Sequence, residues 1–315
     1  MQKRALGGSG ISISPLVLGG NVFGWTADEP ASFELLDHFV ERGFNAIDTA
    51  DVYSAWAPGL RGGESETVLG NWIARRGRRD DIVLMTKVGM WRQHEGLSAH
   101  NIQAAVEGSL RRLRTDYLDV YFAHIDDESV PLEETLGAFS KLVQAGKVRA
   151  IGASNYSAGR LGKALAVSGE NKLARYEIMQ PLYNLYDRAA FEDELAGAAA
   201  EHGLGVVSYF SLASGFLTGK YRTLEDLDGS SRANFLKKYF NERGLKLLEE
   251  LLAVSKDLSV QPAQVALAWL LTRPGLTAPI ASATRLTQLD EVLDSVSIAL
   301  PQEALSRLEA ASAPS

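Results

Sequence analysis

Short runs of β-type residues alternate with longer stretches of helical spacing along most of this chain. Eight strand candidates can be marked, and each is followed by a helical stretch: residues 16–18, 46–48, 82–86, 118–122, 148–153, 178–180, 205–209 and 277–280. Several of them lack polar alternation, which is typical of parallel strands buried on both faces. Eight successive βα units predict an α/β fold in which the strands close into a single (β/α)8 TIM barrel.

Two more β-type runs, residues 3–6 and 11–14, precede these strands and flank the glycine-rich stretch 7–10. This spacing predicts a β-hairpin, which we expect to cap the bottom of the barrel. No internal repeat, low-complexity tract or linker interrupts the chain, and α/β barrels routinely fill this length as one domain. We therefore expect residues 1–315 to form a single domain.

An open dinucleotide-binding sheet is the main alternative for an alternating pattern. Such a sheet would carry G-x-G-x-x-G directly after its first strand, where this chain reads LGGNVFG at residues 18–24. The sequence also contains no P-loop pattern. The closed barrel is therefore favoured.

Charge and composition exclude several function classes. The formal net charge is −7, so no global positive field attracts nucleic acid or an anionic membrane. The absence of cysteine excludes disulfides, thiolate catalysis and Cys-ligated metals. The sequence has neither a secretory signal pattern nor an apolar run of roughly 20 residues. We expect a cytoplasmic protein, a monomer or small homo-oligomer, whose partner is a small-molecule substrate rather than nucleic acid or membrane.

Polar residues follow three successive predicted strands. Asp48 ends the second strand and Tyr53 follows it, Lys87 ends the third, and His124 follows the fourth. Catalytic residues of α/β barrels come from the carboxyl ends of strands and the loops after them. We therefore expect these four side chains to meet at one point of the barrel mouth.

This set of residues suits the reduction of a carbonyl group. Hydride addition places negative charge on the carbonyl oxygen, which then needs a proton. Tyr53 can supply it if the Lys87 ammonium lowers the pKa of the phenol, and Asp48 keeps that ammonium charged. His124 can orient the carbonyl by hydrogen bonding.

Each residue also has an ordinary structural interpretation. Asp48 can cap a turn, Tyr53 can be a partly buried aromatic residue, and Lys87 can form a structural ion pair. His124 can be a satisfied rim residue. The coincidence of all four at the correct strand ends favours catalysis.

Seven stretches of the chain resemble the aldo-keto reductase superfamily, and the similarity covers nearly the whole sequence. They are LGG at 18–20, FNAIDTADVY at 44–53, GESETVLG at 63–70, TKVG at 86–89, SLRRL with DYLD at 109–119, GKVRAIGASN at 146–155 and LTGKY at 217–221. The resemblance implies that Tyr53 is the general acid, that Lys87 and Asp48 tune it, and that His124 positions the substrate. It also implies NADPH as cofactor, no metal, and a reversible reduction of an aldehyde, ketone or sugar carbonyl.

The same resemblance implies a cofactor extended across the barrel mouth. Ser154, Asn155 and Gln180 would hold the carboxamide and Tyr209 would stack on the nicotinamide. Gly20 and Asp48 are further expected contacts. A long loop would cover the pyrophosphate through Ser211, Leu212, Gly215, Leu217 and Lys220. Here the chain reads Tyr209-Phe210-Ser211-Leu212, whereas many relatives read Tyr-Ser-Pro-Leu; a flexible surface loop is the alternative.

The segment after the last strand resembles the part that wraps the adenosine end. Ser282, Thr284, Arg285, Gln288 and Glu291 are the expected contacts, and Val292 stands where many relatives carry Asn. Thr284 and Arg285 near a helix start can bind a 2′-phosphate. This favours NADP over NAD, with NADH as the alternative cofactor.

Substrate contacts are expected from Trp25, Trp56 and Trp91, together with Tyr53 and His124. The three indoles lie in loops after the first three strands, where they can wall an apolar pocket or pack the loops onto the rim. Asp126 and Asp127, directly after His124, can bind sugar hydroxyls or form a solvated acidic loop.

Two other function classes are alternatives to a carbonyl reductase. A regulatory protein that keeps the cofactor site but has little turnover, as in potassium-channel β subunits that resemble this family, predicts loss of a catalytic residue or added segments. A metal-dependent barrel hydrolase or isomerase predicts several His and carboxylate ligands at strand ends. Of the five histidines, at positions 38, 94, 100, 124 and 202, only His124 lies at such an end.

Overall fold

The eight predicted strands close into a parallel barrel, which confirms the predicted fold class. The structure is a computed structural model that describes residues 1–229 and 232–314. In order around the barrel the strands are β3 (Val17–Gly19), β4 (Ala46–Asp48), β5 (Val83–Val88), β8 (Leu118–Ala123), β9 (Val148–Ser154), β10 (Tyr176–Gln180), β11 (Gly205–Ser208) and β12 (Ala278–Ala281). Every neighbouring pair is parallel, and β12 pairs with β3 to close the ring.

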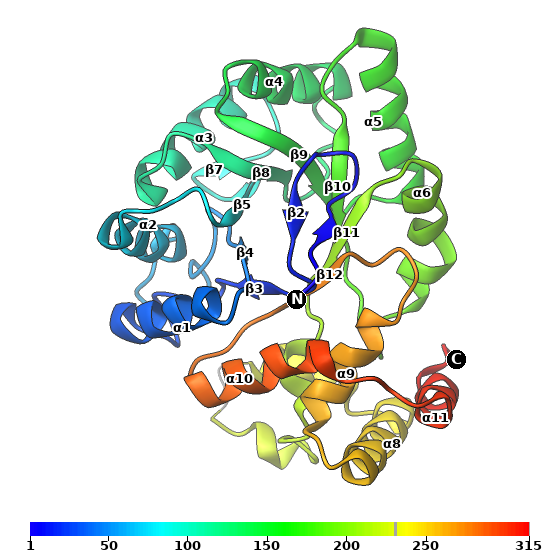
Figure 1. The fold of residues 1–315 in the computed structure, drawn as a ribbon. Helices are drawn as coiled ribbons and strands as arrows, with labels where there is room; N and C mark the ends of the chain where they lie inside the picture. Colours follow the sequence, from blue (N-terminus) through cyan, green and yellow to red (C-terminus); the bar gives the residue numbers. More distant parts are fainter. Residues whose placement is uncertain (230–231, 315) are drawn as a thin grey trace.

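Helices surround this barrel (Figure 1). They are α1 (Glu29–Glu41), α2 (Glu64–Arg76), α3 (Ala99–Leu113), α4 (Leu132–Gln144), α5 (Ala158–Asn171), the π-helix η1 (Ala190–Leu195) with α6 (Ala196–Glu201), α9 (Pro262–Leu271) and α10 (Leu286–Asp294). Further helices, α7 (Ala233–Leu236), α8 (Glu242–Leu258) and α11 (Gln302–Ser312), belong to the long β11–α9 connection and the C-terminal region. Helix α8 packs against α9 and α11.

The N-terminal hairpin closes one end of the barrel, as predicted. Strands β1 (Arg4–Ala5) and β2 (Ser12–Ile13) pair antiparallel. The Arg4 guanidinium donates to the carbonyl of Thr277, just before β12, over 3.0 Å. The backbone N–H of Ser14 donates to the side-chain oxygen of Asn45, just before β4, over 2.8 Å. The hairpin therefore covers the amino ends of the strands, opposite the expected catalytic mouth.

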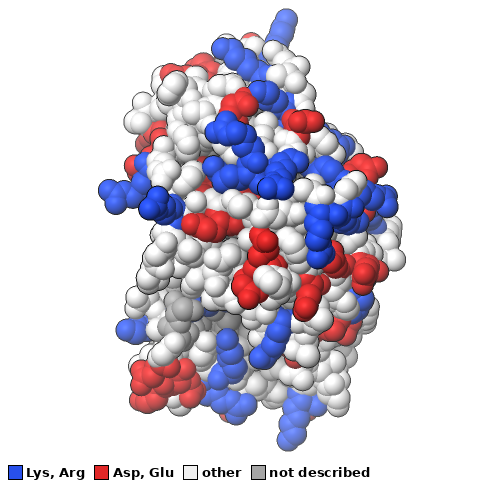
Figure 2. All heavy atoms as spheres, turned by 90° about the vertical axis from the view of Figure 1, so that its left-hand side faces the viewer, with Lys and Arg blue, Asp and Glu red and all other residues white. Residues whose placement is uncertain are grey.

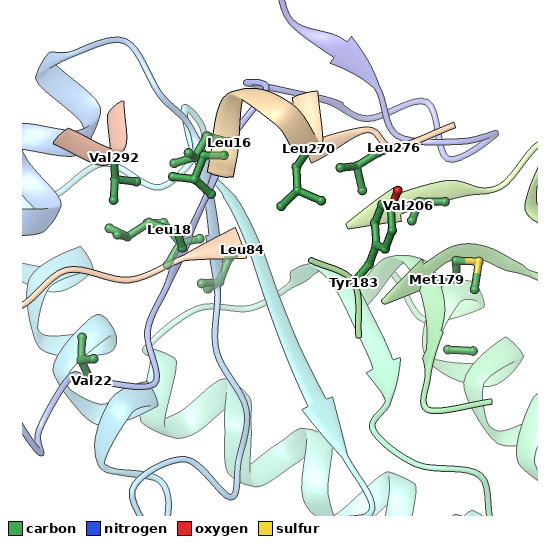
Figure 3. Packing of buried hydrophobic residues seen from close by; sticks show 14 of the residues in the cluster. Leu16, Leu18, Val22, Leu84, Met179, Tyr183, Val206, Leu270, Leu276 and Val292 are labelled. Atoms are coloured by element: carbon green, nitrogen blue, oxygen red, sulfur yellow. The ribbon is translucent and has the colours of Figure 1, made fainter. Parts of the chain in front are cut away.

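Two apolar layers hold the fold together. The inner layer fills the barrel with strand side chains and with three hairpin residues, Leu6, Ile11 and Ile13. The outer layer lies between strands and helices, and Figure 3 shows part of it, including Leu18 of β3, Val206 of β11, Leu270 of α9 and Val292 of α10. Because both faces of each strand are buried, the strands read as apolar runs without alternation.

One pair of strands was not predicted. Strands β6 (Met90–Trp91) and β7 (His94–Glu95) form a short antiparallel hairpin between β5 and α3. Each has two residues, and β7 consists of a histidine and a glutamate, so no run of β-type residues indicates it.

The loop predicted between the seventh and eighth strands contains short helices. Helix η2 (Ala213–Thr218) and η3 (Glu225–Leu227) are 3-10 helices within it, and η4 (Lys237–Tyr239) follows α7. The loop predicted between these strands comprises roughly residues 211–232. Its residues 230 and 231 lie outside the described part of the chain. Another 3-10 turn, η5 (Ser295–Ser297), follows α10.

The basic cluster at the end of α2 consists of paired side chains. Arg75 and Arg76 contact Asp37 and Asp81, and Arg78 lies 3.2 Å from Asp80. Arg79 lies 2.7 Å from the buried carboxylate of Asp119. Figure 2 shows the α1–α3 side of the molecule, where basic side chains lie next to acidic ones. In the described ranges, no helix is long and apolar enough to span a bilayer.

Candidate active site

Lys87 and Asp48 form a buried ion pair at the carboxyl end of the barrel. Asp48 ends β4 and pairs in register with Gly19 and Met85. Lys87 lies two residues beyond Met85 on β5, so its side chain can reach Asp48. Its ammonium donates to Asp48 Oδ2 over 2.6 Å and to the carbonyl of Thr49 over 2.7 Å. Both side chains are almost completely buried.

Tyr53 completes this group. The Lys87 ammonium donates to the Tyr53 hydroxyl over 2.9 Å, and that hydroxyl donates to Asp48 Oδ2 over 3.2 Å. One phenol, one ammonium and one carboxylate are therefore in mutual contact. A proton on the Tyr53 oxygen can be given to a ligand at the mouth while Lys87 remains beside the resulting phenolate.

The net direction of the Tyr53 pKa differs from the sequence-based expectation. Burial raises the pKa of Tyr53 well above its ordinary value, and the Asp48 carboxylate raises it further. The lowering expected from Lys87 does not prevail because burial of the phenol, and after it the nearby Asp48 carboxylate, disfavours the phenolate. The consequence is a phenol that is fully protonated at neutral pH, as a proton donor requires.

Burial also acts on Lys87 and His124. It lowers the pKa of Lys87, and the contact with Asp48 opposes that change. Burial lowers the pKa of His124 well below its usual range, and the Lys87 charge lowers it further. The imidazole is therefore neutral at pH 7, so only one of its ring nitrogens carries a proton.

The His124 ring lies next to the Tyr53 ring. Its backbone N–H donates to the carbonyl of Val88 over 2.9 Å, which fixes it at the end of β5 and β8. The ring centroids of Tyr53 and His124 are 6.1 Å apart. Its Nδ1 is buried and has no hydrogen-bond partner within the described residues.

A chain of hydrogen bonds connects this group to the ends of β9, β10 and β11. Gln180 Nε2 donates to Asp48 Oδ1 over 2.9 Å, and the Ser154 hydroxyl donates to the carbonyl of Gln180 over 2.9 Å. Asn155 Nδ2 donates to the Ser154 hydroxyl over 3.2 Å and to the carbonyl of His124 over 2.8 Å. The Tyr209 hydroxyl donates to Asn155 Oδ1 over 2.7 Å. The three residues expected to hold the carboxamide and Tyr209, expected to stack on the nicotinamide, thus form one network.

The backbone of Gly20 contacts the backbone of Asp48. Its N–H donates to the carbonyl of Asp48 over 2.7 Å, and a Cβ at this position would lie 3.0 Å from the Ser65 hydroxyl. The next residue, Asn21, accepts a hydrogen bond from the Ser282 hydroxyl over 2.5 Å. Asn21 was not among the predicted site residues, although it directly follows the Gly-Gly pair.

The predicted pyrophosphate loop forms a separate group after β11. The Ser211 hydroxyl donates to the carbonyl of Ser208 over 3.1 Å, and the side chain of Leu217 is buried in the apolar core. Gly215 has a φ of +104°, a conformation that favours glycine. Lys220 is exposed, with its ammonium 4.6 Å from the Tyr221 ring centroid. Leu212 precedes η2 and is half-buried.

The predicted adenosine residues lie at the start of α10. Arg285 is the N-cap residue and is exposed, and its side chain does not cap the helix. Gln288 Oε1 accepts hydrogen bonds from the Thr284 backbone at 3.1 Å and from the Thr284 hydroxyl at 3.0 Å. Glu291, one turn further, is half-buried.

The three tryptophans have different surroundings. The Trp56 and Tyr53 ring centroids are 5.7 Å apart, and those of Trp25 and Trp56 are 5.6 Å apart. Trp91 instead packs among loops: its indole N–H donates to the carbonyl of Arg61 over 2.8 Å, and the Arg112 guanidinium lies 5.1 Å from its ring centroid. The structure brings Trp56 beside Tyr53 and Trp25 beside Trp56, whereas Trp91 contacts the 61–62 turn.

Comparison with known proteins identifies the family. The aldo/keto reductase family profile matches residues 15–313. The chain belongs to the aldo/keto reductase family. An uncharacterized oxidoreductase of Bacillus subtilis, YrpG, is 36% identical over 98% of this chain and 95% of its own length. A probable voltage-gated potassium channel subunit beta of Arabidopsis thaliana is 33% identical over 95% and 92%. Norsolorinic acid reductase B of Aspergillus parasiticus is 32% identical over 95% and 81%.

Membership in this family makes the chain an NAD(P)H-dependent oxidoreductase that reduces carbonyl groups. The reaction needs a proton donor next to the reacting oxygen. It also needs groups that hold a nicotinamide cofactor across the same mouth.

The sequence did not predict a second buried polar cluster of this aldo/keto reductase, near the Lys87–Asp48 pair. Glu66 accepts from the Thr86 hydroxyl over 2.6 Å and from Arg112 Nε over 2.7 Å. Both Asp51 carboxyl oxygens and the Tyr121 hydroxyl are buried without a hydrogen-bond partner in the described chain. Burial raises the pKa of Asp51 well above its ordinary value, and Glu66 raises it further. Asp51 and Glu66 both lie in motifs that carry the family resemblance, which was the available signal.

Proposed function

We propose that this chain reduces an aldehyde, ketone or sugar carbonyl with NADPH, reversibly, with Tyr53 as general acid. The observation that carries the proposal is the contact of the Lys87 ammonium with both the Tyr53 hydroxyl, at 2.9 Å, and Asp48, at 2.6 Å. A protonated phenol beside a fixed cation can protonate a carbonyl oxygen and tolerate the negative charge left behind. Neutral His124, whose ring centroid lies 6.1 Å from that of Tyr53, would donate a hydrogen bond to the same oxygen.

The residues at the mouth fit a nicotinamide cofactor. The amides of Gln180 and Asn155 and the hydroxyl of Ser154 suit a carboxamide group, and the half-buried ring of Tyr209 suits stacking. Gly20 packs closely against Ser65 and Asp48, which favours glycine there, and it is assigned as a cofactor contact by position. When bound, the reduced nicotinamide supplies the hydride.

The remaining cofactor contacts are assigned by position. Residues of the loop after β11 would cover the pyrophosphate: Ser211, Leu212, Gly215, Leu217 and Lys220. Ser282, Gln288 and Glu291 would hold the adenosine end. The preference for NADPH rests on Thr284 and exposed Arg285 at the start of α10, where backbone N–H groups and a guanidinium both favour phosphate oxygens.

The test is a panel of aldehydes, ketones and keto-sugars assayed with NADPH and with NADH by absorbance. Turnover of at least one carbonyl, faster with NADPH and abolished in Tyr53→Phe, is the expected result. Turnover that Tyr53→Phe leaves unchanged would remove Tyr53 from its assigned role.

A second candidate is a cofactor-binding regulatory protein with little turnover. It is favoured by the 33% identity to a protein named as a probable potassium channel subunit beta. The intact contact among Asp48, Tyr53 and Lys87 supports the enzyme instead. Tight NADPH binding without reduction of any carbonyl in the panel would favour the regulatory protein.

A further inference from the structure

A continuous aromatic wall leads from the catalytic hydroxyl to the surface. Tyr53 and Trp56 meet edge to face at 5.7 Å, and Trp56 and Trp25 meet edge to face at 5.6 Å. The rings come from the loops after β3 and β4, and Trp56 is 45% exposed. A molecule whose carbonyl reaches Tyr53 can therefore contact the Trp56 indole, which the Trp25 indole extends.

Other exposed apolar side chains lie at the same end of the barrel. Met90, Ile125 and Phe210 are 44%, 39% and 41% exposed, and they follow β5, β8 and β11. With Trp56, these apolar side chains come from four different strand ends. Exposed apolar side chains at the loop end of the barrel, which also carries Tyr53, suit an apolar ligand.

The acidic residues that would bind sugar hydroxyls are occupied elsewhere. Asp126 Oδ1 accepts from Arg160 Nε over 2.9 Å. Asp127 Oδ2 accepts from the backbone N–H of Leu97 over 2.8 Å, and its other oxygen accepts from the Ser129 hydroxyl over 2.5 Å. One carboxylate oxygen of Asp126 and both of Asp127 therefore already accept hydrogen bonds from within the protein.

From these observations we propose that the substrate is an aromatic aldehyde or ketone whose ring lies against Trp56 and Trp25. This rests on the proposed function. The carbonyl oxygen reaches the Tyr53 hydroxyl and takes its proton, while the carbonyl carbon accepts a hydride from the reduced nicotinamide. The C=O π bond is lost, a C–H and an O–H bond form, the carbonyl is reduced to an alcohol and the nicotinamide is oxidised.

The experiment compares benzaldehyde with cyclohexanecarbaldehyde, which has a similar size but no aromatic ring, and with glyceraldehyde. We expect the highest kcat/KM for benzaldehyde and the lowest for glyceraldehyde. Trp56→Ala should raise the KM for benzaldehyde about 3- to 10-fold more than the KM for glyceraldehyde, the range expected for one aromatic contact. Trp56→Phe should restore most of the lost affinity.

Two controls separate this proposal from the proposed function. Leu245→Ala removes an equally exposed apolar side chain on α8, away from the mouth, and should change no KM. Quenching of tryptophan fluorescence by benzyl alcohol, weakened in Trp25→Ala and Trp56→Ala, reports aromatic binding without turnover.

The outcomes are distinct. No reduction of any carbonyl, with quenching intact, would overturn the proposed function and leave the aromatic site. A preference for glyceraldehyde, or equal losses for all three aldehydes in Trp56→Ala, would overturn the aromatic site while leaving the reductase. Absence of any quenching by benzyl alcohol would also overturn it.

Discussion

The ammonium of Lys87 lies 2.9 Å from the Tyr53 hydroxyl while it holds Asp48 at 2.6 Å, so one fully buried cation joins the phenol to the carboxylate. The proposed proton donor and its charge partners are thus in direct contact with one another. Substitution of Tyr53 or of Lys87 can therefore test the role of each residue separately.

Tyr53→Phe removes the proposed proton donor and little volume. We expect kcat for carbonyl reduction to fall about 10²- to 10⁴-fold, the usual contribution of general acid catalysis. Cofactor affinity, measured by fluorescence titration, should stay nearly unchanged. A variant that retains kcat within about threefold of the original protein would contradict the assignment.

Lys87→Met distinguishes a tuning cation from a structural one. If Lys87 stabilises the phenolate, its loss raises the Tyr53 pKa further, and the alkaline limb of the pH–kcat profile for alcohol oxidation moves to higher pH. Loss of the cation also strands Asp48, at a cost of about 3–5 kcal/mol in the free energy of unfolding. An unshifted profile together with a large fall in Tm would reject the tuning role.

Arg285→Ala tests the cofactor preference. Loss of one charged hydrogen bond to a 2′-phosphate should weaken NADPH binding by about 1.5–3 kcal/mol and leave NADH binding almost unchanged. Fluorescence titration with both cofactors measures the difference. Equal weakening of both would show that Arg285 does not read the 2′-phosphate.

Asp51→Asn tests the buried acid behind the catalytic pair. Because burial and Glu66 raise the pKa of Asp51, folding stability should fall as pH rises from the ordinary carboxyl value toward the folded pKa. Asparagine cannot ionise, so the variant should lose less stability than the original protein between about pH 5 and pH 8. Melting curves across this range measure the effect.

The surface substitution Asp116→Asn is the matched control for that series. Its carboxylate is exposed at the α3–β8 connection, so its removal should leave the pH dependence of Tm unchanged. A parallel pH dependence for Asp51→Asn and the original protein would mean that Asp51 is ionised in the fold.

Helix α5 offers a stability test with the same amino-acid change at two places. Lys172, the C-cap, has a φ of +55°, a left-handed conformation that favours glycine. Lys172→Gly should therefore raise the free energy of unfolding by about 1 kcal/mol. Lys163→Gly, at an exposed interior position of the same helix, should lower it by about 1 kcal/mol. Changes of the same sign in urea unfolding would reject the explanation.

The barrel could be predicted because burial on both faces leaves a direct trace in sequence. The strand predicted at 46–48 coincides with β4, and the other seven barrel strands overlap their predicted ranges, with ends that differ by up to two residues. Hairpin β6–β7 left no such trace, because its pairing depends on the turn and on contacts with α3 rather than on an apolar run.

The catalytic contacts could be predicted from strand ends, but their consequences could not. The positions of Tyr53, Lys87 and Asp48 follow from the register of neighbouring strands. The direction of the Tyr53 pKa depends on a 3.2 Å contact with Asp48 and on burial, which spacing does not reveal. The surroundings of Trp91 could not be predicted from spacing either. Its loop position resembles that of Trp25, but its indole N–H donates to the Arg61 carbonyl.

The N-terminal hairpin closes the amino end of the barrel, so only the loop end gives access to Tyr53. Leu6, Ile11 and Ile13 fill its lower end, so whatever reacts at Tyr53 must arrive and depart on the loop side. A cofactor and a substrate that enter by the same route obstruct each other. The ligand that binds deeper has to bind first and dissociate last. Because strand and hairpin side chains together fill the barrel, ligands that overlap on the loop side would bind and leave in a fixed order.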